Sequence, residues 1–261
     1  MASTVDDIEN SRYLSVDGML QYTSMKCPLL PQESYYDQGE KCIGIWPHIV
    51  RIASVWAEVR TYVAKCANDQ VKAPWCPDSD YVRINSHVLD MEIGFPPFYR
   101  YDAANFIDRD IEEISEKRQY WLPWMCVQIN FHVIHTVMNH PFIYSWWGSK
   151  PQPGPSAFWR TSSELALLHS TWIARLIAMA NKKGLELSDP FFAHAAAVAA
   201  TIHSYWSRDT DSKVRATAVG YLEICVSFLA GIGMHWPFCR SIVSSKLQCR
   251  LPAGRPRFAS C

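Results

Sequence analysis

Apolar residues recur at three- and four-residue steps along most of this chain, and proline- or glycine-containing links separate one such run from the next. The first clear run lies between Ile43 and about Cys66, with Pro47 near its start. This spacing places apolar side chains on one face of an α-helix, and proline is tolerated in a first helical turn. No stretch alternates apolar and polar residues for long enough to predict a sheet. We therefore expect an all-α, multi-helix bundle of about six to eight helices with proline- and aromatic-rich links.

Start and stop signals bound the remaining helices. They predict helices over Asp78–Ile93, from an N-cap at Asp102 through Ile114, and over Pro123–Tyr144, Ser156–Gly184, Asp189–Ile202 and Ser212–Ala230. Pro141 is expected to crowd the end of the third of these. Gly184 is expected to cap the fourth in a left-handed conformation, and Gly231 and Gly233 to end the last.

The same spacing predicts which side chains face the core in three of the later helices. They are Val127, Phe131, Ile134 and Met138; then Leu165, Leu168, Trp172, Leu176 and Met179; and finally Val219, Leu222, Val226 and Leu229. The alanines that follow Pro190 predict a close approach between helices.

The composition supports a folded chain with no bias towards nucleic acid. Hydrophobic residues make up 49% of the 261 residues and charged residues 19%, which suffices for a large core. The 25 basic and 25 acidic residues cancel, whereas nucleic-acid binding relies on excess positive charge. The basic stretch Lys246–Arg257 is interpreted as a solvated tail rather than a phosphate-binding patch.

The cysteine pattern indicates a reducing compartment, and the start of the chain shows no targeting signal. The nine cysteines are irregularly spaced and form no CxxC pair, which is typical of reduced, buried thiols. The polar, acidic start of the chain is unlike a signal or transit peptide. The two most apolar stretches, Phe191–Ile202 and Val219–Met234, contain a charged or titratable residue and are expected to be buried helices rather than membrane spans.

These observations divide the chain into three parts. We expect a flexible leader over residues 1–40, a helical domain over 41–240 and an irregular basic tail over 241–261.

Histidines near the middle of the chain form one candidate metal site. His132 and His135 lie one helical turn apart, and His140 follows closely. A zinc site of this type usually needs a further ligand and often a carboxylate between the histidines, where this chain has Val133 and Ile134. We expect His132 to pack or hydrogen-bond inside the bundle, and we predict no metal site.

An acidic cluster, Asp108–Glu113, suggests an alternative function. All-α enzymes that act on prenyl diphosphates hold magnesium with carboxylates on one helix face, and Asp108 and Glu112 have that spacing. Arg109 dilutes the charge and no second cluster opposes it, so a solvated helix face is favoured. No nucleophile elbow, phosphate-binding loop or dinucleotide-binding turn occurs. We therefore predict no enzyme activity, no catalytic residue and no cofactor.

Five short motifs occur in an order that resembles a known family. A helix ends with Trp56 and a following Tyr-Val, and a link carries Trp75, Ser79 and Tyr81. A Pro-Pro segment then leads to Arg100. A helix containing Phe131-His132 leads to His140-Pro141-Phe142, and Asp189-Pro190-Phe191 opens a later helix. Together these motifs, over roughly residues 40–240, resemble the fungal-specific transcription factor domain, also called the middle homology region.

The resemblance implies a regulatory domain whose landmark residues build the scaffold. These landmarks are Trp56, Trp75, Ser79, Tyr81, Arg100, His132, Pro141, Asp189 and Pro190. Trp75 and Tyr81 would anchor the link to the bundle, and Pro141 would end a long helix so that Phe142 tucks back.

The resemblance also implies a place of action and a set of partners. Members of this family act in the nucleus and carry an N-terminal zinc cluster, so zinc is expected only there. No such cluster precedes residue 40, so we expect a truncated homologue, a fragment or an imperfect gene model, which reaches DNA only indirectly. Its expected partners are co-regulators, a full-length homologous factor or a small-molecule effector, with no membrane, in the regulation of transcription at a metabolic or biosynthetic gene cluster.

Overall fold

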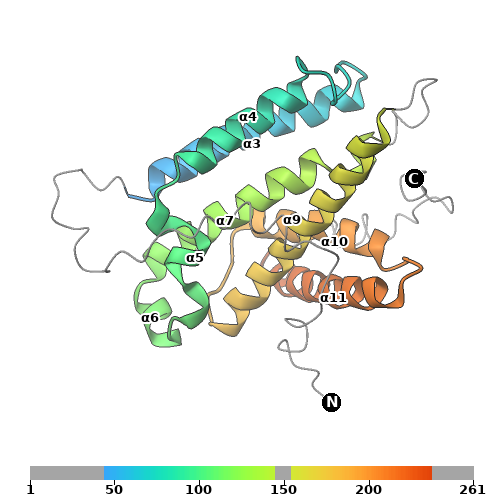
Figure 1. Ribbon diagram of the computed structural model, residues 1–261. Coiled ribbons are helices and arrows are strands. Elements are labelled where there is room, and N and C mark those ends of the chain that lie inside the picture. Colours follow the sequence, from blue (N-terminus) through green and yellow to red (C-terminus); the bar gives the residue numbers. More distant parts are fainter. Residues whose placement is uncertain (1–43, 145–153, 237–261) are drawn as a thin grey trace. The chain divides into compact units, whose positions relative to one another are not determined.

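The computed structural model describes residues 44–144 and 154–236 (Figure 1). Every regular element in these residues is a helix, which confirms the all-α bundle. The α-helices are α3 (Trp46–Ala67), α4 (Asp80–Ile93), α5 (Tyr101–Ala104), α6 (Ile111–Glu116), α7 (Arg118–Met138), α8 (Pro141–Tyr144), α9 (Ser156–Lys182), α10 (Pro190–Trp206) and α11 (Ser212–His235). Two 3₁₀ turns, η1 (Pro97–Tyr99) and η2 (Phe106–Asp108), join α4 to α6. The predicted leader and basic tail lie outside the described residues.

Helix α7 forms the centre of the bundle, where it packs against α3, α9 and α10. Its buried side chains point in nearly every direction, from Trp121 and Trp124 near its start to Met138 at its end. The Trp124 indole is fully buried and donates a hydrogen bond to the Tyr99 carbonyl at 2.8 Å. That bond satisfies the one polar atom of a large apolar side chain, so η1 is held on the core at little energetic cost.

The predicted bounds of this central helix are wrong at both ends. The helix begins at Arg118 rather than Pro123, so Pro123 lies in its second turn, where it removes one backbone hydrogen bond. Burial of Trp121 and Trp124 on either side of Pro123 compensates for that loss. At the other end the helix stops at Met138, and Pro141 opens the short helix α8 instead of kinking a longer one.

The single helix expected from Asp102 to Ile114 is also wrong. Asn105 adopts a left-handed conformation with φ of 50°, and Arg109 is extended, so the segment divides into α5, η2 and α6. Arg100 rather than Asp102 is the N-cap residue of α5. Three- and four-residue spacing continues through the breaks, which is why the apolar pattern alone did not show them.

Helices α9 and α10 begin and end close to the predicted positions, and their capping residues explain why. Asp189 accepts a hydrogen bond from the Phe191 amide at 2.7 Å, as expected of an N-cap before Pro190. Gly184 follows α9 with φ of 67°, and the amide of Leu185 donates to the Ala180 carbonyl at 2.9 Å. With the bond from the Gly184 amide to the Asn181 carbonyl, it forms a Schellman motif, which confirms the predicted left-handed cap.

The buried face of α9 differs from the prediction. Leu176 is buried as expected, but Leu165, Leu168, Trp172 and Met179 are only partly buried. The core instead receives the side chains one step further round the helix: Ser162, Ala166, His169, Ser170, Ile173, Ala174, Ile177 and Ala180. The polar members of this set bond to the polar groups of α7 and its C-terminal end, or to the backbone of α9 itself. On α10 the alanines are buried as predicted and α7, α9 and α11 pack around them.

Helix α11 is longer and more exposed than predicted. It continues through Gly231 and Gly233 to His235, since glycine in a helix costs only about 1 kcal/mol. Ala218, Cys225, Leu229 and Ile232 face the core, whereas the expected Val219 is exposed.

By length and composition α11 could cross a membrane, and 28% of its most apolar window is buried in the bundle. The expectation of a buried helix therefore holds only in part: Cys225 and Leu229 are buried, whereas Leu222 and Phe228 are partly buried against the core. Core helices of water-soluble proteins meet the same length and composition criteria.

Cysteines in the described residues carry free thiols, namely Cys66, Cys76, Cys126 and Cys225. Burial raises the pKa of the Cys126 thiol to about 11 and that of Cys225 to about 12. Both thiols are therefore protonated near neutral pH, as expected of inert core cysteines. The remaining cysteines lie outside the described residues.

Candidate functional site

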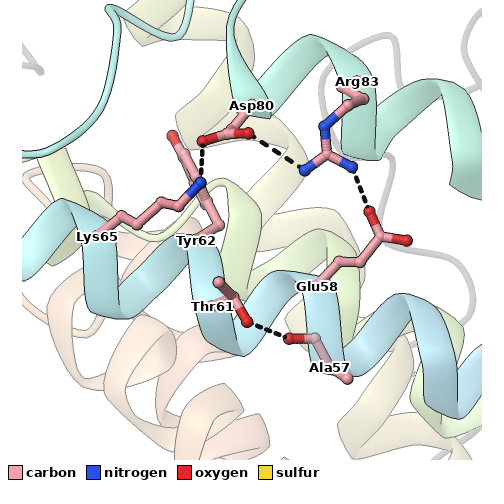
Figure 2. Close-up of a pocket in the computed structure, with 7 residues that line it drawn as sticks. All are labelled: Ala57, Glu58, Thr61, Tyr62, Lys65, Asp80 and Arg83. Atoms are coloured by element: carbon pink, nitrogen blue, oxygen red, sulfur yellow. Dashed lines mark hydrogen bonds and ion pairs between the residues drawn. The ribbon is translucent and has the colours of Figure 1, made fainter.

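A groove of about 230 Å³ lies between α3 and α4 and is lined by four charged side chains (Figure 2). Asp80 links two bases there: the Lys65 ammonium donates to one carboxylate oxygen at 3.0 Å and the Arg83 guanidinium to the other at 3.2 Å. Arg83 also donates to Glu58 at 2.6 Å. The seven lining residues are Ala57, Glu58, Thr61, Tyr62, Lys65, Asp80 and Arg83.

The hairpin formed by α3 and α4 creates this charge arrangement. Ser79 caps α4 by accepting a hydrogen bond from the Val82 amide, which fixes Asp80 in the first helical turn. The last turn of α3 carries Lys65 directly opposite. Bonding to Lys65, and secondarily to Arg83, lowers the pKa of the Asp80 carboxyl. Bonding to Glu58 raises the pKa of Arg83, so both groups stay ionised.

The two carboxylates of the groove are held in ion pairs, Asp80 with Lys65 and Arg83, and Glu58 with Arg83. The nearby Cys66 thiol has a pKa raised by burial, which disfavours the reactive thiolate. The paired charges can exchange partners with a ligand or with a docking protein that offers both apolar surface and charge.

Sequence reasoning missed this groove. Lys65 and Asp80 are fifteen positions apart, and the charged side chains of each helix are common on exposed helix faces. Only the antiparallel pairing of α3 with α4 brings Glu58, Lys65, Asp80 and Arg83 together, and no local motif signals that pairing.

Three of the landmark residues lie in the link before α4 and at its start. The Trp75 ring contacts Phe158 and Trp159 at the start of α9, with centroid separations of 5.8 and 5.5 Å. The Ser79 hydroxyl is buried and donates to the Pro74 carbonyl at 3.1 Å. Tyr81 donates from its hydroxyl to the Asn139 side chain at 2.9 Å. In this structure Trp75 and Tyr81 therefore anchor the link to the bundle.

The other landmarks are dispersed over the fold. Trp56 on α3 packs edge-on against Phe191 and His194 of α10. Arg100 is exposed and its guanidinium lies 3.4 Å from the Phe95 carbonyl. Asp189 and Pro190 start α10. None of these residues lines the α3–α4 groove, so the landmarks and the groove are separate features.

Pro141 and Phe142 differ from the expected arrangement. Phe142 does not tuck back, because its side chain is exposed. Tyr144 occupies the core instead, with its hydroxyl donating to the Met138 carbonyl and lying 3.4 Å from the Tyr62 hydroxyl. The short helix α8 that Pro141 opens rotates the chain so that the third residue after the proline faces inward.

The candidate metal histidines contribute to a packed aromatic cluster. His132 lies 2.9 Å from His169 between their Nδ1 atoms, and the rings of His135 and His169 stack at 4.3 Å. The expectation that His132 packs and hydrogen-bonds inside the bundle is therefore confirmed. His140 is elsewhere, bonded to Thr201 at 2.8 Å. Within the described residues, no group of three or more potential ligands has a geometry that could hold a metal ion.

Burial determines the charge state of this histidine cluster. It lowers the pKa of His132 to about 3 and that of His135 to about 4, and it lowers the pKa of His169 well below its usual value. All three rings are therefore neutral near pH 7. In the contact between His132 and His169, one Nδ1 must carry the proton and donate, and the other must accept. His169 carried no sequence signal, since it lies 37 positions from His132.

The acidic cluster lacks the geometry of a magnesium site. Asp108 belongs to η2 and Glu112 to α6, so the two carboxylates do not share a helix face. Glu113 is instead bonded to Lys117 at 3.0 Å and lies 3.5 Å from Arg109. The expected solvated helix face is divided between η2 and α6, with Asp108 and Glu112 both exposed.

Comparison with known proteins identifies similar sequences. The chain is 21% identical over 212 residues, or 80% of its length, to the Zn(2)-C6 fungal-type transcription factor FTF1c of Fusarium oxysporum f. sp. lycopersici. It is 22% identical over 196 residues, or 74% of its length, to FTF2 of the same organism. This chain is similar to fungal Zn(2)-C6 transcription factors.

The similarity covers only part of those relatives. The chain spans 22% of the length of FTF1c and 17% of FTF2, about a fifth of each. No protein-family model and no solved structure matches the chain.

Proposed function

We propose that this chain is the regulatory helical domain of a fungal zinc-cluster-type transcription factor. The observation that supports the proposal best is the similarity to Zn(2)-C6 transcription factors along about four fifths of the chain. The landmarks of the middle homology region support it further, because Trp75, Ser79 and Tyr81 act as scaffold residues.

In this proposal the domain works in the nucleus and reaches DNA through protein partners. It controls a metabolic or biosynthetic gene cluster, and a co-regulator, a homologous factor or a small-molecule effector sets its activity. It needs no cofactor of its own, and zinc belongs to the zinc cluster of a full-length factor. The α3–α4 groove offers a surface for either a protein partner or a small molecule.

A tethered reporter assay tests the proposal. The chain is fused to a heterologous DNA-binding module upstream of a reporter gene in a fungal host, and a fluorescent tag reports its location. We expect nuclear fluorescence and a change in reporter output of at least several-fold relative to the module alone. The variant Ile134→Asp, which places a charge in the core, should abolish the change.

Two outcomes would contradict the proposal. The first is a reporter output equal to that of the module alone under every inducer tried. The second is an Ile134→Asp variant that regulates as well as the original chain, since regulation would then not need the fold.

A further inference from the structure

The α3–α4 pair exposes apolar side chains on the side facing away from the core. Trp46 and Val50 on α3, and Leu89 and Ile93 on α4, are each more than half exposed. Residues four apart share one face of a helix, so each pair forms a local apolar strip. Single exposed apolar residues are ordinary, whereas a contiguous group marks an interaction surface.

These two strips lie at the same end of the hairpin. A Cβ atom added to Gly94, just after α4, would lie 3.1 Å from the Arg51 guanidinium, so the end of α4 adjoins the start of α3. Figure 1 shows α3 and α4 running alongside one another in agreement with this contact. The two strips therefore lie at adjacent helix ends, and their four residues together are called the apolar patch.

The outer side of α3 connects this patch to the charged groove. Ala53, Ala57 and Ala64 are exposed there, and their short side chains protrude little from the helix. Ala57 also lines the groove, so the two features are continuous. A partner lying along the hairpin would cover the apolar patch at one end and the charged groove at the other.

The charges of the groove favour an acidic partner. Lys65 is 42% exposed and its partner Asp80 25%, while Arg83 is 50% exposed and its partner Glu58 31%. In each ion pair the basic group reaches further into solvent than the acid. Arg60 adds a further exposed base on the outer side of α3.

We propose that this surface docks an acidic amphipathic helix of a partner protein. The surface, called the α3–α4 face, comprises Trp46, Val50, Ala53, Ala57, Arg60, Ala64, Lys65, Arg83, Leu89 and Ile93. The apolar strip of the partner helix packs on the apolar patch, and its carboxylates meet Lys65, Arg83 and Arg60. The two-helix surface supplies the shallow channel that a helix needs for such packing. This inference rests on the partner role in the proposed function and names the chemistry of that partner.

A labelled model peptide tests the inference directly. The probe is a synthetic helix of about 18 residues, roughly five turns, with leucine along one side and glutamate flanking it. Fluorescence anisotropy measures its binding to the full chain. We expect saturable binding that weakens with added salt. The same peptide with lysine in place of every glutamate should bind at least about tenfold more weakly.

Variants of the chain locate the binding surface. Val50→Glu and Arg60→Glu should each reduce the affinity about tenfold, and neither breaks an ion pair of the groove. The matched substitutions Val219→Glu on α11 and Lys182→Glu at the end of α9 should leave the affinity unchanged. Circular dichroism of every variant should match that of the original chain.

Several results would overturn the inference. They are the absence of binding, equal binding of the lysine peptide, and insensitivity to Val50→Glu. A dimer in sedimentation that Val50→Glu dissociates would assign the face to a second copy of the chain. Shielding of Trp46 from hydroxyl-radical oxidation in the free monomer would mean that the chain itself covers the face. A chain that regulates the reporter but fails these tests keeps the proposed function and loses only this partner.

Discussion

The hydroxyl of Ser79 joins two elements with a single atom. It donates to the Pro74 carbonyl in the link and accepts from the Val82 amide at the start of α4. The side chain is buried, so removal of the hydroxyl leaves two backbone groups without a partner in a place that water reaches poorly. These two hydrogen bonds explain why a serine suits this landmark position.

We predict that Ser79→Ala lowers the free energy of unfolding by about 1–2 kcal/mol, the usual value for loss of an N-cap. Ser86→Ala is the matched control, because its hydroxyl bonds only to the exposed carbonyl one turn earlier in α4. That variant should change stability by less than about 0.5 kcal/mol. Urea denaturation measures both values, and equal effects would refute the capping role.

Among helices, the left-handed end of α9 is the clearest case in which backbone conformation selects the residue. Gly184 has φ of 67° and open space around its Cβ position, so only the backbone resists a side chain there. We predict that Gly184→Ala destabilises the fold by about 1 kcal/mol. Gly220→Ala within α11, where an added Cβ would meet no atom within 4 Å, should instead stabilise it by about 0.5–1 kcal/mol. Thermal unfolding of the two variants should show shifts of opposite sign.

The contact between α7 and α9 should make the fold sensitive to acid. His132, His135 and His169 have lower pKa values in the folded chain than in the unfolded chain, so the unfolded chain binds more protons below about pH 6.5. Stability is therefore constant above that pH and falls as the pH drops towards about 4. At pH 5 each histidine contributes up to about 2 kcal/mol of destabilisation.

The variant His135→Phe should flatten this pH dependence, while His235→Phe at the exposed end of α11 should leave it unchanged. The measurement is the urea midpoint between pH 7.5 and 5. An identical slope for His135→Phe and the original chain would show that the cluster does not control acid unfolding. Buried His203, with its pKa lowered to about 4, would then be the next group to test.

For the molecule as a whole, the sequence revealed the helices more reliably than their faces. Apolar spacing and caps predicted α3, α4, α9 and α10, because those signals are local. The inward turn of Ser162 and His169 was not predictable, since it depends on the polar groups of Asn139 and His132 that face them. The groove was missed for the same reason: its charges meet only after α3 and α4 pair.

The alanine-rich α10 shows how tightly the helices are packed together. Ala196 is fully buried where α7, α9 and α11 surround α10. We predict that Ala196→Leu destabilises the chain by about 1–3 kcal/mol, because the added volume must push helices apart. Ala216→Leu on the exposed side of α11 should have little effect. Calorimetry of both variants measures the difference.

Helix α4 packs chiefly against α3, whereas α7 is enclosed by three other helices. Amide protons of α7 should therefore exchange with deuterated solvent only on global unfolding, while those of α4 exchange through a smaller, local opening. Within the hairpin that carries the charged groove, α4 is then the helix that can loosen without unfolding the bundle. Any molecule that grips both helices of the hairpin would slow deuterium uptake there and leave the uptake of α7 unchanged.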